Sequence, residues 1–70
     1  MSVKQIKWIL NKALFLIRAY EGRILTDREF EGMTDFVEKT VRESKGNEYC
    51  RKLMLDVLEC FDQDQQGGTP

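Results

Sequence analysis

The stretch LTDREF at residues 25–30 marks the start of a helix and divides the chain in two. A Thr followed three residues later by a Glu is typical of a capping box, in which each side chain accepts a backbone amide hydrogen bond at the helix start. Leu25 and Phe30 occupy the two positions where apolar side chains pack across such a cap. Asp27 and Glu29 place negative charge beside the positive end of the helix dipole. The sequence therefore predicts a helix that begins at residue 27.

This predicted helix extends to residue 44. Its apolar residues recur at helical spacing: Phe30, Met33, Phe36, Val37 and Val41. Gly32 lies inside it, which costs about 1 kcal/mol relative to Ala. It is either a point of close backbone approach or an exposed residue without consequence. Gly46 and Asn47 then end this helix and begin the next, because Gly suits the residue past a helix and Asn is a good N-cap.

A third helix is predicted over residues 48–62, and the short connection makes it an antiparallel neighbour of the second. Apolar side chains cover about half of its circumference, wide enough to contact two neighbours. They are Tyr49, Cys50, Leu53, Met54, Val57, Leu58, Cys60 and Phe61. Residues 63–70 are polar and contain two Gly, so we expect a disordered polar tail.

On the other side of LTDREF, residues 3–21 form the first predicted helix, with Gly22 just past its end. Its main apolar arc consists of Val3, Ile6, Ile9, Leu10, Ala13, Leu14, Leu16, Ile17 and Tyr20. The sequence thus predicts an all-α fold, a small antiparallel three-helix bundle with helices at about 3–21, 27–44 and 48–62. These helices make a single helical domain over residues 1–62.

Trp8, Phe15 and Ala19 lie opposite the main arc of the first helix, at spacings that return to nearly the same face. Two interpretations remain open. If the first helix is packed on both sides by the others, these residues belong to the core. If the main arc already satisfies two neighbours, they form an intermolecular surface, because interfaces concentrate Trp and Phe. We favour the second interpretation and expect association through the first helix, with another protein or a second copy as a homodimer.

The near-neutral net charge of −1 conceals an uneven distribution. Residues 1–23 contain five basic residues and one acidic residue, whereas residues 24–70 contain six basic and eleven acidic residues. Lys4, Lys12 and Arg18 accompany the aromatic residues on the first helix, and we include them among the predicted partner-binding residues. The alternative is charge complementarity within the chain. A nucleic-acid-binding regulator could also use this basic face, although the pI of about 5.4 argues against it.

Catalysis is not expected. The chain has 70 residues, no His and two Cys, so it lacks the usual residues for a zinc site, a nucleophile pair or a general base near neutral pH. Its carboxylates are spread over solvent-facing positions, and we predict no cofactor or metal. Cys50 and Cys60 are ten residues apart, roughly 15 Å along one helix, too far for a disulfide between them. We predict that both are reduced and buried.

Polar residues at Gln5, Lys7, Asn11 and Lys12 interrupt the first apolar stretch, so we expect no signal peptide, no membrane span and a cytoplasmic location. The predicted function is that of a non-enzymatic protein-interaction module, an adaptor, inhibitor or regulatory subunit that presents a helix face. In length the chain resembles the small phage and plasmid regulators that act as dimers, which implies a bacterial accessory role.

Overall fold

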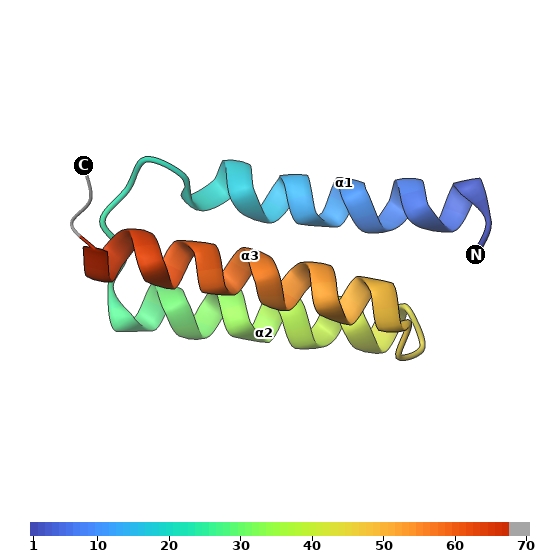
Figure 1. Cartoon of the computed structure of the whole chain (residues 1–70). Coiled ribbons are helices and arrows are strands. Elements are labelled where there is room, and N and C mark those ends of the chain that lie inside the picture. Colours follow the sequence, from blue (N-terminus) through green and yellow to red (C-terminus); the bar gives the residue numbers. More distant parts are fainter. Residues whose placement is uncertain (68–70) are drawn as a thin grey trace.

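The computed structural model describes residues 1–67 of the 70-residue chain, with side chains through Gln65. This part of the chain forms three helices and no strand: α1 (Val3–Tyr20), α2 (Asp27–Glu43) and α3 (Glu48–Gly67). Figure 1 shows the helices along a common direction, with α2 antiparallel to both α1 and α3. The predicted all-α, antiparallel three-helix bundle is confirmed.

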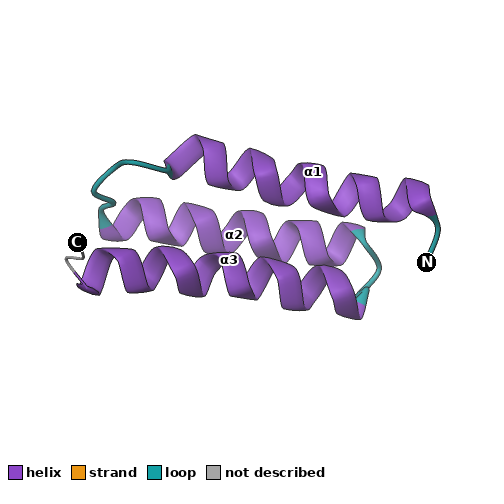
Figure 2. Cartoon of the chain, turned by 45° about the horizontal axis from the view of Figure 1, so that its top comes forward, coloured by secondary structure: helices purple, strands orange, loops and turns teal. Residues whose placement is uncertain are grey.

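The three helices are not packed equally. α2 and α3 pack more closely with each other than either does with α1, which lies along one side of this pair (Figure 2). The bundle is elongated and measures 38 × 22 × 17 Å. Over the described residues, no helix combines the length and the apolar character that crossing a membrane requires.

The capping box predicted in LTDREF is present at the start of α2. The Glu29 amide donates to Thr26 Oγ1 at 3.2 Å, and the Thr26 amide donates to Glu29 Oε1 at 3.0 Å. This amide, together with the Arg23 guanidinium and the Thr26 hydroxyl, holds the pKa of Glu29 below its ordinary value. The stabilisation that ionised Glu29 provides is therefore present above the ordinary carboxyl pKa and is lost as the pH falls through the lowered one.

The other two helices have N-terminal caps as well. Asn47 caps α3 as predicted, because its Oδ1 accepts a hydrogen bond from the Cys50 amide at 3.0 Å. A further capping box, absent from the sequence prediction, begins α1: the Gln5 amide donates to Ser2 Oγ at 3.1 Å and the Ser2 amide to Gln5 Oε1 at 2.8 Å. All three helix starts are thus fixed by local side-chain hydrogen bonds.

The core is formed by the inward faces of all three helices and by the connection between α1 and α2. Its buried apolar residues are Ile9, Ala13, Leu16, Leu25, Met33, Val37, Cys50, Met54, Val57 and Phe61. Thr40 is buried with them, and no buried polar atom among the described side chains lacks a hydrogen-bond partner. Burial of each large apolar side chain contributes roughly 1.5–3 kcal/mol, which makes this core the main source of stability.

The buried sector of α1 is narrower than the predicted apolar arc. Ile9 and Leu16 are buried, whereas Val3, Leu10 and Leu14 are 82%, 46% and 42% exposed. The prediction that the whole arc faces two neighbours is wrong for these three residues. The reason is geometric, because one side of a helix pair covers only the inward part of a third helix.

The C-terminal boundary also differs from the prediction. α3 continues to Gly67, so residues 63–67, predicted as part of a disordered tail, are helical. Gln65 explains the extension, because its Oε1 accepts from the Leu25 amide at 3.0 Å and its Nε2 donates to the Arg23 carbonyl at 3.1 Å. These bonds attach the last turns of α3 to the α1–α2 connection. The remainder of the predicted tail, residues 68–70, lies outside the described residues.

The two cysteines lie in different environments. Cys50 is fully buried as predicted, but Cys60 is exposed, which corrects the expectation that both are core residues. On α3, Val57 and Phe61 occupy the inward positions, and Cys60 lies on the flank beside α1. A broad apolar arc cannot by itself show which of its edges a neighbour covers.

Left-handed backbone occurs in both connections, at Gly22 in the first and at Lys45 (φ 61°) and Gly46 in the second. Gly22 and Gly46 have φ angles of 71° and 73°, as predicted for residues past a helix, but after α2 the first left-handed residue is Lys45 and Gly46 is the second. Gly32, in contrast, lies in α2, where an added Cβ would meet the Tyr20 hydroxyl at an ordinary contact distance of 3.6 Å. The structure therefore favours the interpretation in which Gly32 has no required role.

Replacing Thr26 by Ala should lower the free energy of unfolding by about 1 kcal/mol, because the α2 cap loses its hydroxyl acceptor. Thr34 supplies a matched control, since its hydroxyl bonds to the Phe30 carbonyl inside the same helix and Thr34→Ala removes no cap. Chemical denaturation of both variants measures the difference. Equal losses of stability in the two variants would contradict the assignment of the cap.

Replacing Gly32 by Ala should raise the free energy of unfolding by up to about 1 kcal/mol, because Ala is the better helix former. The control is Gly22→Ala, which should be destabilising because its φ angle is positive. Urea titrations of the two variants should move in opposite directions. A destabilised Gly32→Ala protein would restore the close-approach interpretation.

Candidate interaction surface

The orientation of α1 determines what the bundle exposes. Because Ile9, Ala13 and Leu16 face inward, one flank of α1 lies toward α2 and the other toward α3. Five of the eight large hydrophobic residues that are exposed in the described chain belong to residues 1–15: Met1, Val3, Leu10, Leu14 and Phe15. Exposed apolar surface is therefore concentrated on and beside α1.

The flank toward α2 contains an aromatic cluster made of Trp8, Lys12, Phe15 and Phe36. The Phe15 and Phe36 rings are stacked, with centroids 5.6 Å apart and an interplanar angle of 23°. The Lys12 ammonium lies 5.3 Å from the Trp8 ring centroid and 6.0 Å from that of Phe36, within cation–π range. This contact fixes the edge of α1 against α2.

The predicted aromatic residues on α1 therefore have different environments. Trp8 is half-buried and packs against the core, while Phe15 remains 63% exposed despite its contact with Phe36. Ala19 is exposed, and its carbonyl accepts a hydrogen bond from Arg23 Nη1 at 3.1 Å. The position of Trp8 thus agrees with the interpretation that it belongs to the core, and the position of Phe15 agrees with the interpretation that it lies on the surface. Their role in binding a partner stays a prediction.

The predicted basic residues are also divided. Lys4 and Arg18 are exposed on the outer side of α1, together with Lys7, whereas Lys12 is half-buried in the aromatic cluster. Among the described side chains, ion pairs join Arg23 to Glu29 and Arg51 to Glu48. The basic residues of α1 itself form no ion pair with any side chain that the structure describes. Within the described part of the chain, the ion pair that joins the basic first segment to the rest is therefore that of Arg23 in the α1–α2 connection, and the outer basic residues of α1 face solvent.

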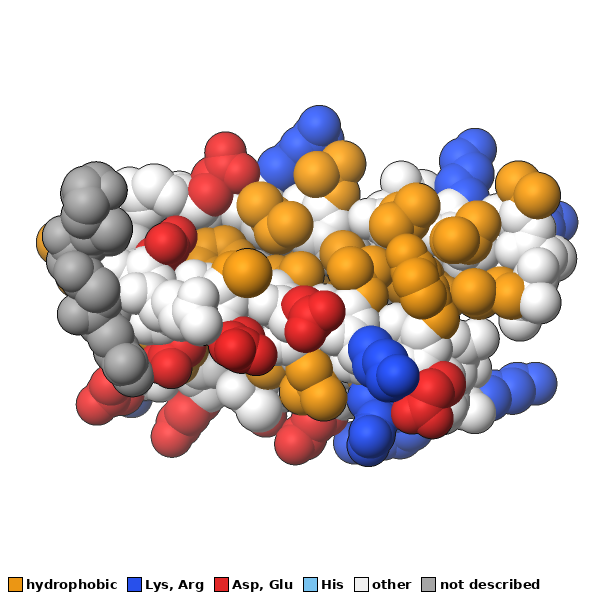
Figure 3. Space-filling model, in the orientation of Figure 1, with side chains coloured by type: hydrophobic (Ala, Val, Ile, Leu, Met, Phe, Trp, Pro, Cys, Tyr) orange, Lys and Arg blue, Asp and Glu red, His pale blue; other side chains and the backbone are white. Residues whose placement is uncertain are grey.

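The flank toward α3 carries exposed apolar residues that the site prediction did not include. We define the α1–α3 apolar face as Val3, Leu10, Leu14, Ile17, Tyr49, Leu53 and Cys60. Figure 3 shows apolar side chains gathered along the line where α1 and α3 meet. Leu10 and Tyr49 are 46% and 40% exposed, and Ile17 and Leu53 are half-buried. The signal was present in the sequence as the outer edge of the α1 arc, next to Lys7 and Arg18.

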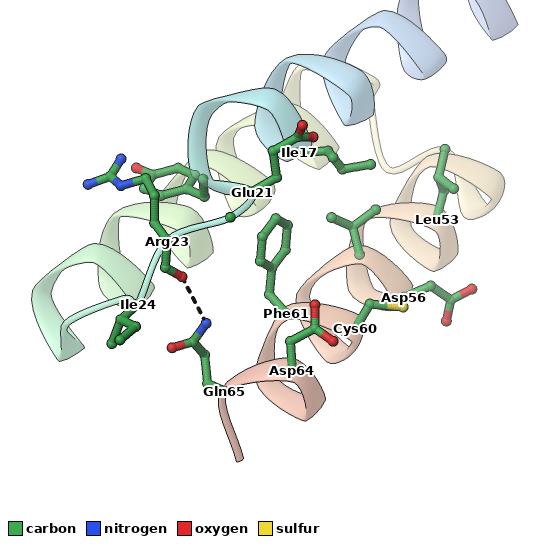
Figure 4. A pocket seen from close by; sticks show the side chains of 13 residues that line it. Ile17, Glu21, Arg23, Ile24, Leu53, Asp56, Cys60, Phe61, Asp64 and Gln65 are labelled. Atoms are coloured by element: carbon green, nitrogen blue, oxygen red, sulfur yellow. Dashed lines mark hydrogen bonds between the residues drawn. The ribbon is translucent and has the colours of Figure 1, made fainter. Parts of the chain in front are cut away.

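At its C-terminal end this face is hollowed into a groove of about 880 Å³ between α1, the α1–α2 connection and α3. Figure 4 shows Ile17, Leu53 and Phe61 on its walls. Three carboxylates, from Glu21, Asp56 and Asp64, stand around it. The groove is an apolar depression with acidic residues at its rim.

The end of the groove is held by Arg23. Its guanidinium pairs with Glu29 and lies 5.7 Å from the Tyr20 ring centroid, while its carbonyl accepts the hydrogen bond from Gln65. The α1–α2 connection is thereby attached to both α2 and α3. The groove is consequently formed before any partner binds, as is usual for binding sites.

The chemistry available on this surface is apolar contact and charge. Over the described residues, no three His, Cys, Asp or Glu side chains come together in a way that could hold a metal ion. The expectation that the protein is not an enzyme stays a prediction. A scan against models of protein families, a search of curated proteins and a search of solved structures each gave no match.

Proposed function

We propose that this protein is a non-enzymatic interaction module, an adaptor, inhibitor or regulatory subunit, that binds a partner protein through α1. The observation that carries the proposal is the concentration of exposed large hydrophobic residues on and beside this one helix. Exposed apolar surface bordered by polar residues marks interaction sites on small proteins. Here Lys7 and Arg18 border the α1–α3 apolar face on one side and Asp56 on the other.

Phe15, Leu10 and Leu14 are the residues expected to contribute most to binding. Each is substantially exposed, so a partner would bury it without rearranging the bundle. Large apolar side chains at the centre of an interface usually provide most of its affinity. Trp8 contributes less under this proposal, because the bundle and Lys12 already cover part of its ring.

The nucleic-acid alternative is favoured by one observation, the exposure of Lys4, Lys7 and Arg18 without ion pairs among the described side chains. The acidic side chains of α2 and α3 oppose it, because a nucleic acid would be repelled by most of the molecule. Titration with a mixed-sequence duplex at low salt discriminates the two functions, since electrostatic affinity is greatest there. Binding abolished by Arg18→Glu would support the nucleic-acid function.

Affinity capture from the native host tests the proposed function. The double variant Leu10→Ser, Leu14→Ser and the single variant Phe15→Ser should each lose a partner that the unmodified protein retains, with unchanged helical circular dichroism. A matched control is Glu31→Ser with Glu38→Ser, which alters exposed residues of α2. If the surface variants and the control retain the same proteins in the same amounts, α1 is not the binding surface.

A further inference from the structure

We propose that the partner of the α1–α3 apolar face is a second copy of this chain, and that the two copies lie parallel, with α1 of each over α3 of the other. The inference rests on the proposed function, and it specifies the occupant of the part of that surface made by Leu10 and Leu14, whereas Phe15, on the flank toward α2, lies outside this contact. It is carried by the charges that border this face.

The border of the face is mainly basic along α1, where it ends at Glu21, and mainly acidic along α3, where Lys52 interrupts it. At 100° per residue, Lys7 and Arg18 follow directly after Leu10 and Leu14 around α1. On α3, Asp56 stands beside Cys60 and Leu53, and Asp64 is at the end of the groove. The apolar face therefore lies between an edge with Lys7 and Arg18 and an edge with Asp56 and Asp64, and the opposite charges of these pairs outweigh Glu21 and Lys52.

Two copies that meet through the same face are related by a two-fold axis in the plane of contact. If the axis crosses the helices, the copies are antiparallel, and each basic edge meets the other basic edge. If the axis runs along the helices, the copies are parallel, and each basic edge meets an acidic edge. Because opposite charges are favoured across an interface, the charge pattern selects the parallel arrangement.

The same arrangement fills the groove. α1 and α3 run in the same direction, and Ile17 lines the groove together with Leu53, Val57 and Cys60. Rotation about a two-fold axis parallel to the helices leaves the position of each residue along the bundle unchanged, so equivalent residues of the two copies lie at the same level. Leu14 of one copy then meets the apolar groove of the other, and Arg18 lies near Asp56 at the groove rim. The exposed residues of the α1–α3 apolar face on each copy are thus covered by the other, as in a four-helix core made of two α1 and two α3 helices.

Sedimentation equilibrium over a wide range of protein concentration tests the association. We expect a species of twice the 8.2 kDa chain mass, which the variant Leu10→Ser, Leu14→Ser should reduce to monomer. The reactivity of the Cys60 thiol provides a second measure of dimer formation, because Cys60 is exposed on the face while Cys50 is fully buried. Its reaction with a thiol reagent should slow as the dimer forms.

Charge reversal tests the orientation. Arg18→Glu and Asp56→Arg should each weaken the dimer about fivefold, and the two together in one chain should restore it, because the pair reforms across the interface. Asp35→Lys, an exposed change on α2 half a turn away from buried Met33, should leave the dimer unchanged. Reversals that are additive rather than compensating would overturn the parallel arrangement.

Other outcomes overturn the choice of occupant. A monomer at every concentration would exclude self-association, while the capture experiment with host proteins would still decide whether α1 binds a different protein. A dimer lost in Phe15→Ser but retained in Leu10→Ser, Leu14→Ser would place the contact on the aromatic cluster instead. Each result therefore separates failure of the dimer from failure of the proposed function.

Discussion

The contact that the rest of the structure depends on is the narrow one between α1 and the α2–α3 pair. Only Ile9, Ala13 and Leu16 of α1 are buried, although apolar residues cover a much broader part of this helix. A chain of this size buries only about 60% of the surface that its unfolded form exposes, so a helix on the outside of the bundle retains apolar surface. The exposed residues beside α3 are the direct result. The proposed interaction surface follows from how few neighbours α1 has.

The polar contacts at one end of the bundle compensate for this limited burial. The Arg23–Glu29 ion pair attaches the α1–α2 connection to α2, and the hydrogen bonds of Gln65 attach it to the end of α3. These contacts fix where the chain passes from α1 to α2. At the other flank, the stacking of Phe15 on Phe36 and the Lys12–Trp8 contact fix the rotation of α1. Together these contacts keep Leu10 and Leu14 outside the core. The apolar face is therefore a fixed feature of the fold.

Local signals in the sequence predicted the helices well, because their causes are local. Thr26 and Asn47 bond to amides three residues away, and Gly22 and Gly46 relieve strain at their own positions. The end of α3 could not be predicted in this way. Gln65 bonds to residues some 40 positions earlier in the chain, and nothing within α3 indicates that partner.

The candidate site was predicted only in part, for a related reason. Helical periodicity gives the angle of each side chain around α1 but not how the helix is rotated against its neighbours. That rotation places Trp8 partly inside and Leu14 outside, and it depends on contacts such as Phe15 with Phe36. The sequence showed that the first helix has more apolar residues than its neighbours can cover. It did not show on which flank of the helix the uncovered residues would lie.

Hydrogen exchange measured by mass spectrometry, at low and at high protein concentration, tests most directly whether α1 is the incompletely covered helix. At low concentration, amides of α1 should exchange faster than those of α2 and α3, because α1 is the least closely packed helix. At high concentration, α1 and the adjoining flank of α3 should gain protection while α2 stays unchanged. Equal protection of the three helices, independent of concentration, would contradict the account.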